Sequence, residues 1–206
     1  HFNPSTPISD EPVQLKYSDG NIWKPANFDN ENHGEVPLFH GLVYSYNVAT
    51  VRLGLQVGIE EVISVLQKMG LPYEPPSYPS LLLGSLELSP LEVTQLYQTL
   101  ATSGFNIPLR SVREVLTADG IQLTRYPLNV EQTLDISVVH QVNRMLQMVV
   151  EFGTAHQAGK ELPALQAAGK TGTTDDLRDS WFAGFTGQHL AVVWLGRDDN
   201  KPAGLS

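Results

Sequence analysis

The chain has 206 residues, of which 41% are hydrophobic, so it can form one domain with a substantial core. Its formal net charge is −9 and its Lys and Arg residues form no cluster, which argues against nucleic acid as a partner. It contains no cysteine, and its six histidines lack metal-ligand spacing, so thiol catalysis and disulfides are excluded and we expect no metal and no cofactor.

The first 35 residues are rich in Pro, Asn, Asp and Gly and are predicted to be mainly loop. Two short strands are expected, Val13–Tyr17 and Asn21–Trp23. Asp19-Gly20 between them is a hairpin turn signal.

Apolar residues then recur with helical spacing. The predicted helices are a run from Val36 to about Tyr44, Val48–Val57, Ile59–Met69, a helix from Ser89 that ends before Gly104, and one from Asp135 through Glu151. The fourth begins with Ser89-Pro90-Leu91-Glu92, a capping box with proline at the first helical position. The side chains expected to face the core in the last helix are Val138, Val142, Met145, Leu146 and Val149.

Strand-like alternation appears in two places. Ser111–Leu116 and Ile121–Tyr126 flank Asp119-Gly120 and predict a hairpin. Near the end, Leu165–Thr173, Ser180–Phe185 and His189–Leu195 are joined by short turns, so they are predicted to be antiparallel neighbours. Helices followed by a three-stranded meander indicate an α+β fold with a helical lobe and a sheet lobe, and the functional groups are expected where the lobes meet.

Lys170-Thr171-Gly172-Thr173 lies on the first of these three strands. Alternation places Lys170 and Gly172 on one face and Thr171 and Thr173 on the other. Glycine lets a ligand backbone lie close, a strand edge can pair with a peptide, and lysine and threonine can bind a carboxylate. This pattern suits an extended peptide that ends in a carboxylate. The alternative is a strand end with a solvated lysine.

Ser45-Tyr46-Asn47 lies between two predicted helices. Serine and asparagine at such a junction are commonly capping residues, and that interpretation stays open beside a catalytic one. The order Ser-x-Asn and then Lys-Thr-Gly is that of the serine β-lactamases and penicillin-binding proteins.

Longer stretches resemble the transpeptidase domain of the bifunctional class A penicillin-binding proteins, nearest the 1B type of Gram-negative bacteria. The stretches that carry the resemblance are 20–25, 44–58, 83–104, 153–158, 170–185 and 194–198. The resemblance covers nearly all of residues 20–206. It implies an antiparallel sheet with helices on both faces plus a helical lobe.

The family's nucleophile motif, Ser-x-x-Lys, does not occur in the 206 residues. The resemblance therefore leads us to expect that residues 1–206 are part of a transpeptidase domain. The missing parts would be the nucleophile helix, the first strands and the C-terminal helix. An upstream part of the same polypeptide would supply the nucleophile, and an anchor outside this chain would hold the protein at the periplasmic face of the inner membrane.

The resemblance also implies the chemistry. A serine attacks the D-Ala-D-Ala end of a peptidoglycan stem peptide, an acyl-enzyme forms, and an amine from a neighbouring stem completes the cross-link, while β-lactams trap the acyl-enzyme. Ser45 would relay a proton, Asn47 would bind the substrate backbone, and Lys170 would stabilise negative charge and orient Ser45. The implied substrate-binding residues are Thr171, Gly172 and Thr173, with the Thr173 N–H in the oxyanion hole.

Asp179 and Trp181 are expected to be structural, as a strand-start polar group and a core aromatic. Two alternatives come from other functional classes. One is a D,D-carboxypeptidase or serine β-lactamase of the same fold, and the other is a non-catalytic binding module.

Overall fold

The computed structural model describes residues 2–17, 20–161, 166–174 and 177–202. Its helices are α1 (Leu38–Val43), α2 (Asn47–Val57), α3 (Ile59–Lys68), the 3₁₀ helix η1 (Pro79–Leu83), α4 (Pro90–Ala101), α5 (Ile136–Glu151) and α6 (His156–Glu161). Its strands are β1 (Pro7–Ser9), β2 (Leu15–Lys16), β3 (Ile22–Trp23), β4 (Glu35–Pro37), β5 (Phe105–Asn106), β6 (Glu114–Leu116), β7 (Gln122–Arg125), β8 (Glu131–Gln132), β9 (Ala168–Thr173), β10 (Ser180–Phe185) and β11 (Leu190–Leu195). Among these described residues, no helix is long and apolar enough to cross a membrane.

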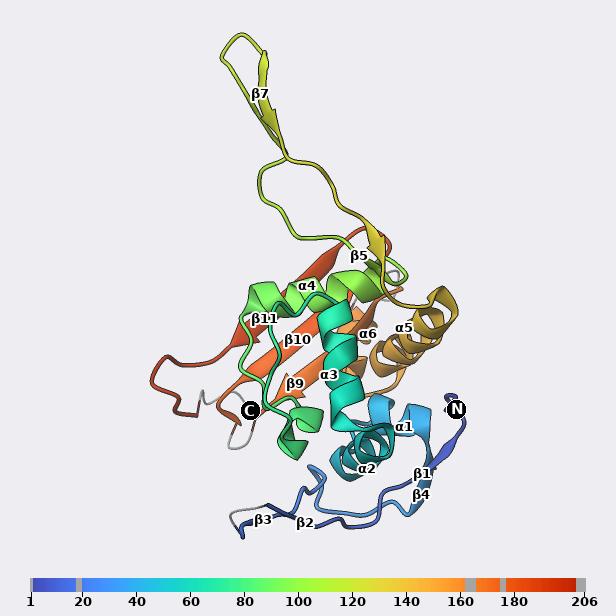
Figure 1. Ribbon diagram of the computed structural model, residues 1–206. Helices are drawn as coiled ribbons and strands as arrows, with labels where there is room; N and C mark the ends of the chain where they lie inside the picture. The colour runs from blue at the N-terminus through green and yellow to red at the C-terminus, as the bar shows by residue number, and fades with distance from the viewer. Residues whose placement is uncertain (1, 18–19, 162–165, 175–176, 203–206) are drawn as a thin grey trace.

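The largest sheet is the predicted antiparallel meander, in the order β11-β10-β9. Phe185 pairs with Ala168 on one side and with Leu190 on the other, so these three side chains share a face. Helices α4 and α5 pack against that face (Figure 1), where Leu146 joins Ala168 and Phe185 in a buried cluster. The α+β expectation and the meander are confirmed.

Helix α5 connects the sheet to the helical part. Its Val149 is buried with Val43 of α1, while Leu146 packs on β9 and β10. The two side chains are three positions apart and so lie on neighbouring parts of the helix surface. One helix therefore fixes the distance between α1 and the sheet.

The start signals of α4 and α5 act as predicted. Ser89 and Glu92 form the reciprocal capping box of α4. Asp135 accepts hydrogen bonds from the N–H groups of Ser137 and Val138 at the start of α5. Both helices consequently begin where the sequence indicates.

Some predictions were wrong in detail. Val36 does not start a helix but lies in β4, which pairs with β1 in the segment predicted as loop. Val138 is 55% exposed and Val139, at 1% exposed, takes the inward position instead, whereas Met145, Leu146 and Val149 are buried as predicted. The pairing of β5 with β8 and helix α6 were not predicted. Residues 165 and 19, which fell in a predicted strand and turn, lie outside the described residues.

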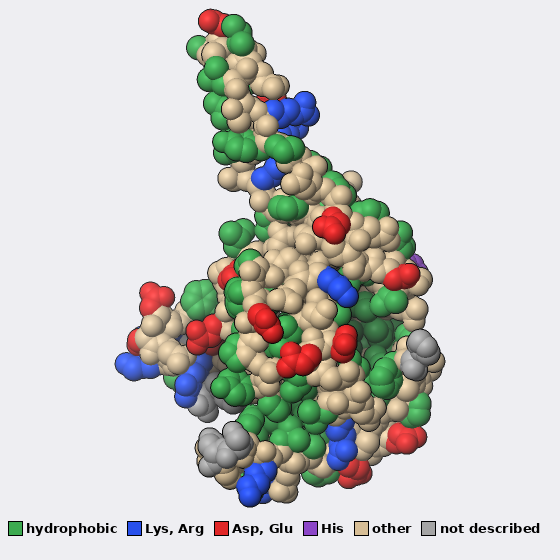
Figure 2. Space-filling model, in the orientation of Figure 1, with side chains coloured by type: hydrophobic (Ala, Val, Ile, Leu, Met, Phe, Trp, Pro, Cys, Tyr) green, Lys and Arg blue, Asp and Glu red, His purple; other side chains and the backbone are tan. Residues whose placement is uncertain are grey.

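The predicted hairpins both form. β2 pairs with β3, and β6 pairs with β7 in an arm that projects from the body (Figure 1). Hydrophobic side chains lie along this arm (Figure 2), and Ile121 and Leu123 are each 64% exposed. The cleft beside β9 is lined, among the described residues, by none from this arm.

The outer strand β11 leaves apolar surface in water. Val193 and Leu195 are 51% and 52% exposed, and they share one face by alternation. Val192 points the other way, toward α4, on the side where Leu190 packs. An apolar edge strand without a charge or proline favours association between chains.

We therefore expect the 206-residue chain to self-associate, and Val193→Lys to shift it toward monomer in size-exclusion chromatography at several concentrations. The free energy of unfolding should change by less than about 0.5 kcal/mol, because position 193 is solvated. Val192→Lys is the matched control and should instead lower stability by roughly 2 kcal/mol or more, since it forces a charge toward α4. A chain that is monomeric before any substitution would contradict the expectation.

Candidate functional site

Ser45 lies in the tight connection between α1 and α2. Its φ is 60°, in the left-handed region that costs a non-glycine residue about 1 kcal/mol. The Tyr46 N–H donates to the Gly41 carbonyl at 2.9 Å, which closes the turn. The strained backbone thus holds the Ser45 side chain in one place.

Lys170 of β9 meets Ser45 across this junction. Its Nζ donates to Ser45 Oγ at 2.9 Å and to the Thr171 carbonyl at 3.0 Å. Burial lowers the pKa of Lys170 to about 8. Among the described residues it has no ion pair with a carboxylate, so a partly dehydrated amine is held by neutral oxygens only.

The rest of Lys-Thr-Gly-Thr follows along the edge strand β9. Thr171 Oγ1 donates to Thr154 Oγ1 at 2.8 Å, which ties β9 to the turn after α5. A Cβ on Gly172 would lie 3.2 Å from the Cβ of Trp181, tighter than most real contacts. Thr173 is exposed at the end of the strand. All four residues line one cleft.

Asn47 is turned another way. Its Nδ2 donates to the Ala26 carbonyl at 2.9 Å, while Tyr46 is the N-cap of α2 and makes no side-chain cap. The structure therefore brings Ser45 and Lys170 together and places Asn47 beside them in sequence but bound to the preceding loop. Neither Ser45 nor Asn47 caps the start of α2, so the capping interpretation was wrong for that helix, whereas Ser45 takes the left-handed conformation that ends α1.

A cleft of about 760 Å³ runs from Lys170 between β9 and the segment of residues 81–97. Its far wall is mostly apolar and includes Leu81, Leu83, Leu86, Leu88 and Tyr97. This wall was not predicted from the sequence, although the closely spaced leucines of residues 81–88 indicate it. The cleft can therefore take a partly apolar ligand or chain segment beside the amine of Lys170.

Two tryptophans form the other side of the cleft. Trp181 and Trp194 have ring centroids 6.2 Å apart, and Trp194 Nε1 donates to Asp179 Oδ1 at 2.9 Å. Asp179 also accepts a hydrogen bond from Thr174 Oγ1, which secures the connection between β9 and β10. The structural role expected for Asp179 fits these contacts, whereas Trp181 lines the cleft rather than the core.

Among the described residues, one group of three could bring cation-binding atoms together. Donor atoms of Asp29, Glu31 and His33 lie within 4.8 Å of one another. The His33 ring is already engaged by Asp10 and Asp29, and Asp29 and Glu31 are exposed. We assign no metal site there.

Similarity to solved structures defines the class of fold. The structure superposes on penicillin-binding protein 1A from Haemophilus influenzae with a TM-score of 0.91 and 20% identity, covering 98% of this chain and 36% of that one. PonA1 of Mycobacterium tuberculosis in complex with penicillin V gives a TM-score of 0.81 at 22% identity and covers 97% and 56%. The fold is that of the penicillin-binding transpeptidase domains.

Sequence comparisons lead further. The family model for the penicillin binding protein transpeptidase domain matches residues 1–204, so the chain belongs to that family. It is 41% identical to penicillin-binding protein 1B of Vibrio cholerae, over all of this chain and 26% of that protein. It is 38% identical to penicillin-binding protein 1B of Escherichia coli, over 99% of this chain and 24% of that protein. The chain thus spans about a quarter of the length of these relatives.

The charged amine of Lys170 is expected to lower the stability of the folded chain. Since its pKa falls from 10.5 to about 8, the folded state disfavours the charged amine by roughly 3 kcal/mol. This cost is fully present below about pH 8 and fades as the pH rises toward 10.5. We expect Lys170→Met to raise the free energy of unfolding near pH 7 by roughly 1–3 kcal/mol, less what its hydrogen bonds contribute, and to lose this advantage near pH 10.

Thermal unfolding of the protein and the variant between pH 6 and pH 10 measures this difference. Lys68→Met is the matched control, because Lys68 is exposed at the end of α3 and its replacement should not stabilise the protein. An equal effect of the two substitutions would contradict a buried, dehydrated Lys170.

Proposed function

We propose that this chain is part of the peptidoglycan D,D-transpeptidase domain of a bifunctional glycosyltransferase/transpeptidase. The observation that supports it most directly is the 2.9 Å hydrogen bond from Lys170 Nζ to Ser45 Oγ, which joins residues 125 positions apart, and Lys170 also lines the cleft. Acyl transfer needs a hydroxyl held by a basic group at the place where a proton must move. Ser45 and Lys170 form such a pair.

In the proposed reaction, the oxygen of a serine bonds to the carbonyl carbon between two terminal D-alanines. The bond from that carbon to nitrogen breaks, and a proton must reach the departing amine. Because Ser45 Oγ accepts the hydrogen bond from Lys170, the hydrogen of the Ser45 hydroxyl can be donated to another group. Ser45 is therefore suited to pass it to the departing amine. Lys170 has a pKa of about 8, so it can give up a proton near neutral pH and return one to the Ser45 hydroxyl.

The substrate is proposed to lie along β9. The edge strand offers backbone groups to an extended stem peptide, and Gly172 puts no side chain beside them. The Thr171 and Thr173 hydroxyls are assigned to the terminal carboxylate, and the Thr173 N–H to half of the oxyanion hole. Asn47 is assigned to the substrate backbone, for which its amide would have to leave the Ala26 carbonyl.

The nucleophile is proposed to come from outside these 206 residues, because no Ser-x-x-Lys occurs in them. The apolar wall opposite β9 is suited to receive the segment that carries it. On this proposal residues 1–206 are a partial domain, completed by an upstream part of the same polypeptide at the periplasmic face of the inner membrane. β-Lactams would bind as substrate mimics. The named relatives are penicillin-binding proteins 1A and 1B, so neither alternative class is retained.

Reaction with a fluorescent penicillin tests the proposal. The polypeptide that contains this chain and its upstream neighbour should gain the mass of one penicillin on a serine outside residues 1–206. The 206-residue chain alone should gain none, because the attacking oxygen is missing. Intact-mass and peptide mass spectrometry read both results. A stable adduct on a serine within the chain, Ser45 included, would overturn the assignment of the nucleophile.

A second test concerns the carboxylate site in the same complete polypeptide. Thr173→Val keeps the shape and strand preference but removes the hydroxyl, so acylation by penicillin should slow about tenfold to a hundredfold, the loss expected for a hydrogen bond to a charge. The melting temperature should hardly change, because Thr173 is exposed. Thr124→Val, on the exposed strand β7, is the matched control and should react at the original rate. Equal rates for the two variants would remove Thr173 from the site.

A further inference from the structure

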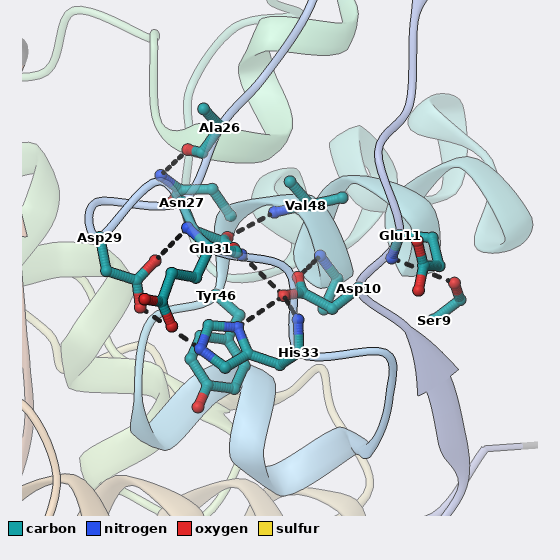
Figure 3. A network of polar contacts seen from close by, with 12 residues as sticks. Ser9, Asp10, Glu11, Ala26, Asn27, Asp29, Glu31, His33, Tyr46 and Val48 are labelled. Atoms are coloured by element: carbon teal, nitrogen blue, oxygen red, sulfur yellow. Dashed lines mark hydrogen bonds and ion pairs between the residues drawn. The ribbon is translucent and has the colours of Figure 1, made fainter.

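A buried carboxylate from the N-terminal segment lies at the start of α2. Asp10 is 0% exposed, and its Oδ1 accepts from the Ala49 N–H at 2.9 Å. Its Oδ2 accepts from Asn27 Nδ2 at 2.7 Å and from the His33 N–H at 3.0 Å. The Val48 N–H donates to Asn27 Oδ1 at 3.2 Å. Two first-turn N–H groups of α2 are thus satisfied by side chains remote in sequence (Figure 3).

His33 connects this carboxylate to the Ser45-Tyr46-Asn47 segment. Its Nδ1 lies 2.8 Å from Asp10 Oδ2, and its Nε2 lies 3.3 Å from Asp29 Oδ2. Its ring stacks on the Tyr46 ring, with centroids 4.0 Å apart and an angle of 15° between the planes. Figure 3 shows the two rings face to face, with Asp10 and Asp29 at the two nitrogens.

Every residue from Tyr46 to Ala49 is therefore held by the segment between β1 and β4. Tyr46 is held by the His33 ring, Asn47 by the Ala26 carbonyl, Val48 by Asn27 and Ala49 by Asp10. Ser45 is the next residue on the other side, and its backbone is strained. A strained residue keeps its conformation only while its surroundings hold it.

We propose that His33, aimed by Asp10, is a positioning residue that keeps the Ser45 hydroxyl against Lys170. This inference rests on the proposed function of Ser45. His33 touches neither Ser45 nor Lys170 directly. It acts through the ring of Tyr46 and the first turn of α2, so its loss should slow acylation without removing a reacting group.

The groups around the His33 ring hold it in place. Those that face it are the carboxylates of Asp10, Asp29 and Glu31 and the phenol of Tyr46. Burial, followed by the charges of Tyr44, Asp29 and Asp10, raises the pKa of Tyr46, so the phenol stays neutral near pH 7.

The experiment measures the rate of penicillin acylation at neutral pH, over a range of penicillin concentrations, in the complete polypeptide and three variants. His33→Phe keeps a ring on Tyr46 but removes both nitrogens. Asp29→Asn keeps the bond between His33 and Asp10 and removes only the contact that depends on charge. His140→Phe replaces an exposed histidine of α5 and is the control.

We expect His33→Phe to lower the limiting first-order rate of acylation about threefold to tenfold and to leave the penicillin concentration at half-saturation unchanged, because His33 positions Ser45 without touching the ligand. Asp29→Asn, which keeps the contact between His33 and Asp10, should lower the limiting rate less, and His140→Phe should not lower it. Equal limiting rates in His33→Phe and His140→Phe overturn the inference, as does a change confined to the half-saturation concentration or a loss that only follows the unfolded fraction.

A second readout does not depend on acylation. Amide hydrogen exchange of a peptide covering residues 46–52, compared at equal pH, reports the Val48 and Ala49 N–H groups. It should be severalfold faster in His33→Phe than in His140→Phe. If the unsubstituted protein is not acylated, the proposed function fails, and the exchange arm alone decides whether His33 holds the segment. Equal exchange in the two variants then overturns that hold.

Discussion

The contact between Lys170 and Ser45 constrains the rest of the structure. It joins an edge strand to a turn between two helices, and a distance of 2.9 Å leaves little tolerance on either side. Helix α5 sets this distance, because it is buried against α1 through Val149 and against the sheet through Leu146. A close-packed interior cannot be compressed or expanded freely, so the packing of one helix is transmitted to the polar pair.

The energetic character of that pair argues for function over stability. A lysine amine that is buried among neutral oxygens, with no carboxylate partner among the described residues, is unfavourable in its charged form. Solvating the same side chain would be cheaper, as would replacing it with an apolar one. Groups of this kind concentrate at sites of chemistry, where a readily shifted proton is useful. The local energetics therefore point to the same two residues as the short sequence motifs do.

Local signals in the sequence predicted much of this fold. The capping box at Ser89, the cap at Asp135 and the alternation after Ala168 each act within a few residues, and each was read correctly. The pairing of β1 with β4 was not predicted, since it joins two three-residue strands whose paired residues are 26 to 30 positions apart and leaves no periodic trace. The buried stripe of α5 was misplaced only at its first residue, because Val138 and Val139 are equally apolar.

The same distinction applies to the site. Two short motifs located Ser45 and Lys170, but nothing near either motif indicated Asp10 or His33, whose contacts depend on the path of the N-terminal loop. This loop also explains why the capping interpretation failed. A helix start needs acceptors for its free N–H groups, and serine or asparagine beside it usually supplies them. Here Asp10 and Asn27 supply them from outside, so the Ser45 hydroxyl is not needed as a cap and can accept the hydrogen bond that Lys170 donates. The chemistry available at Ser45 is in this sense a consequence of a cap provided by side chains remote in sequence.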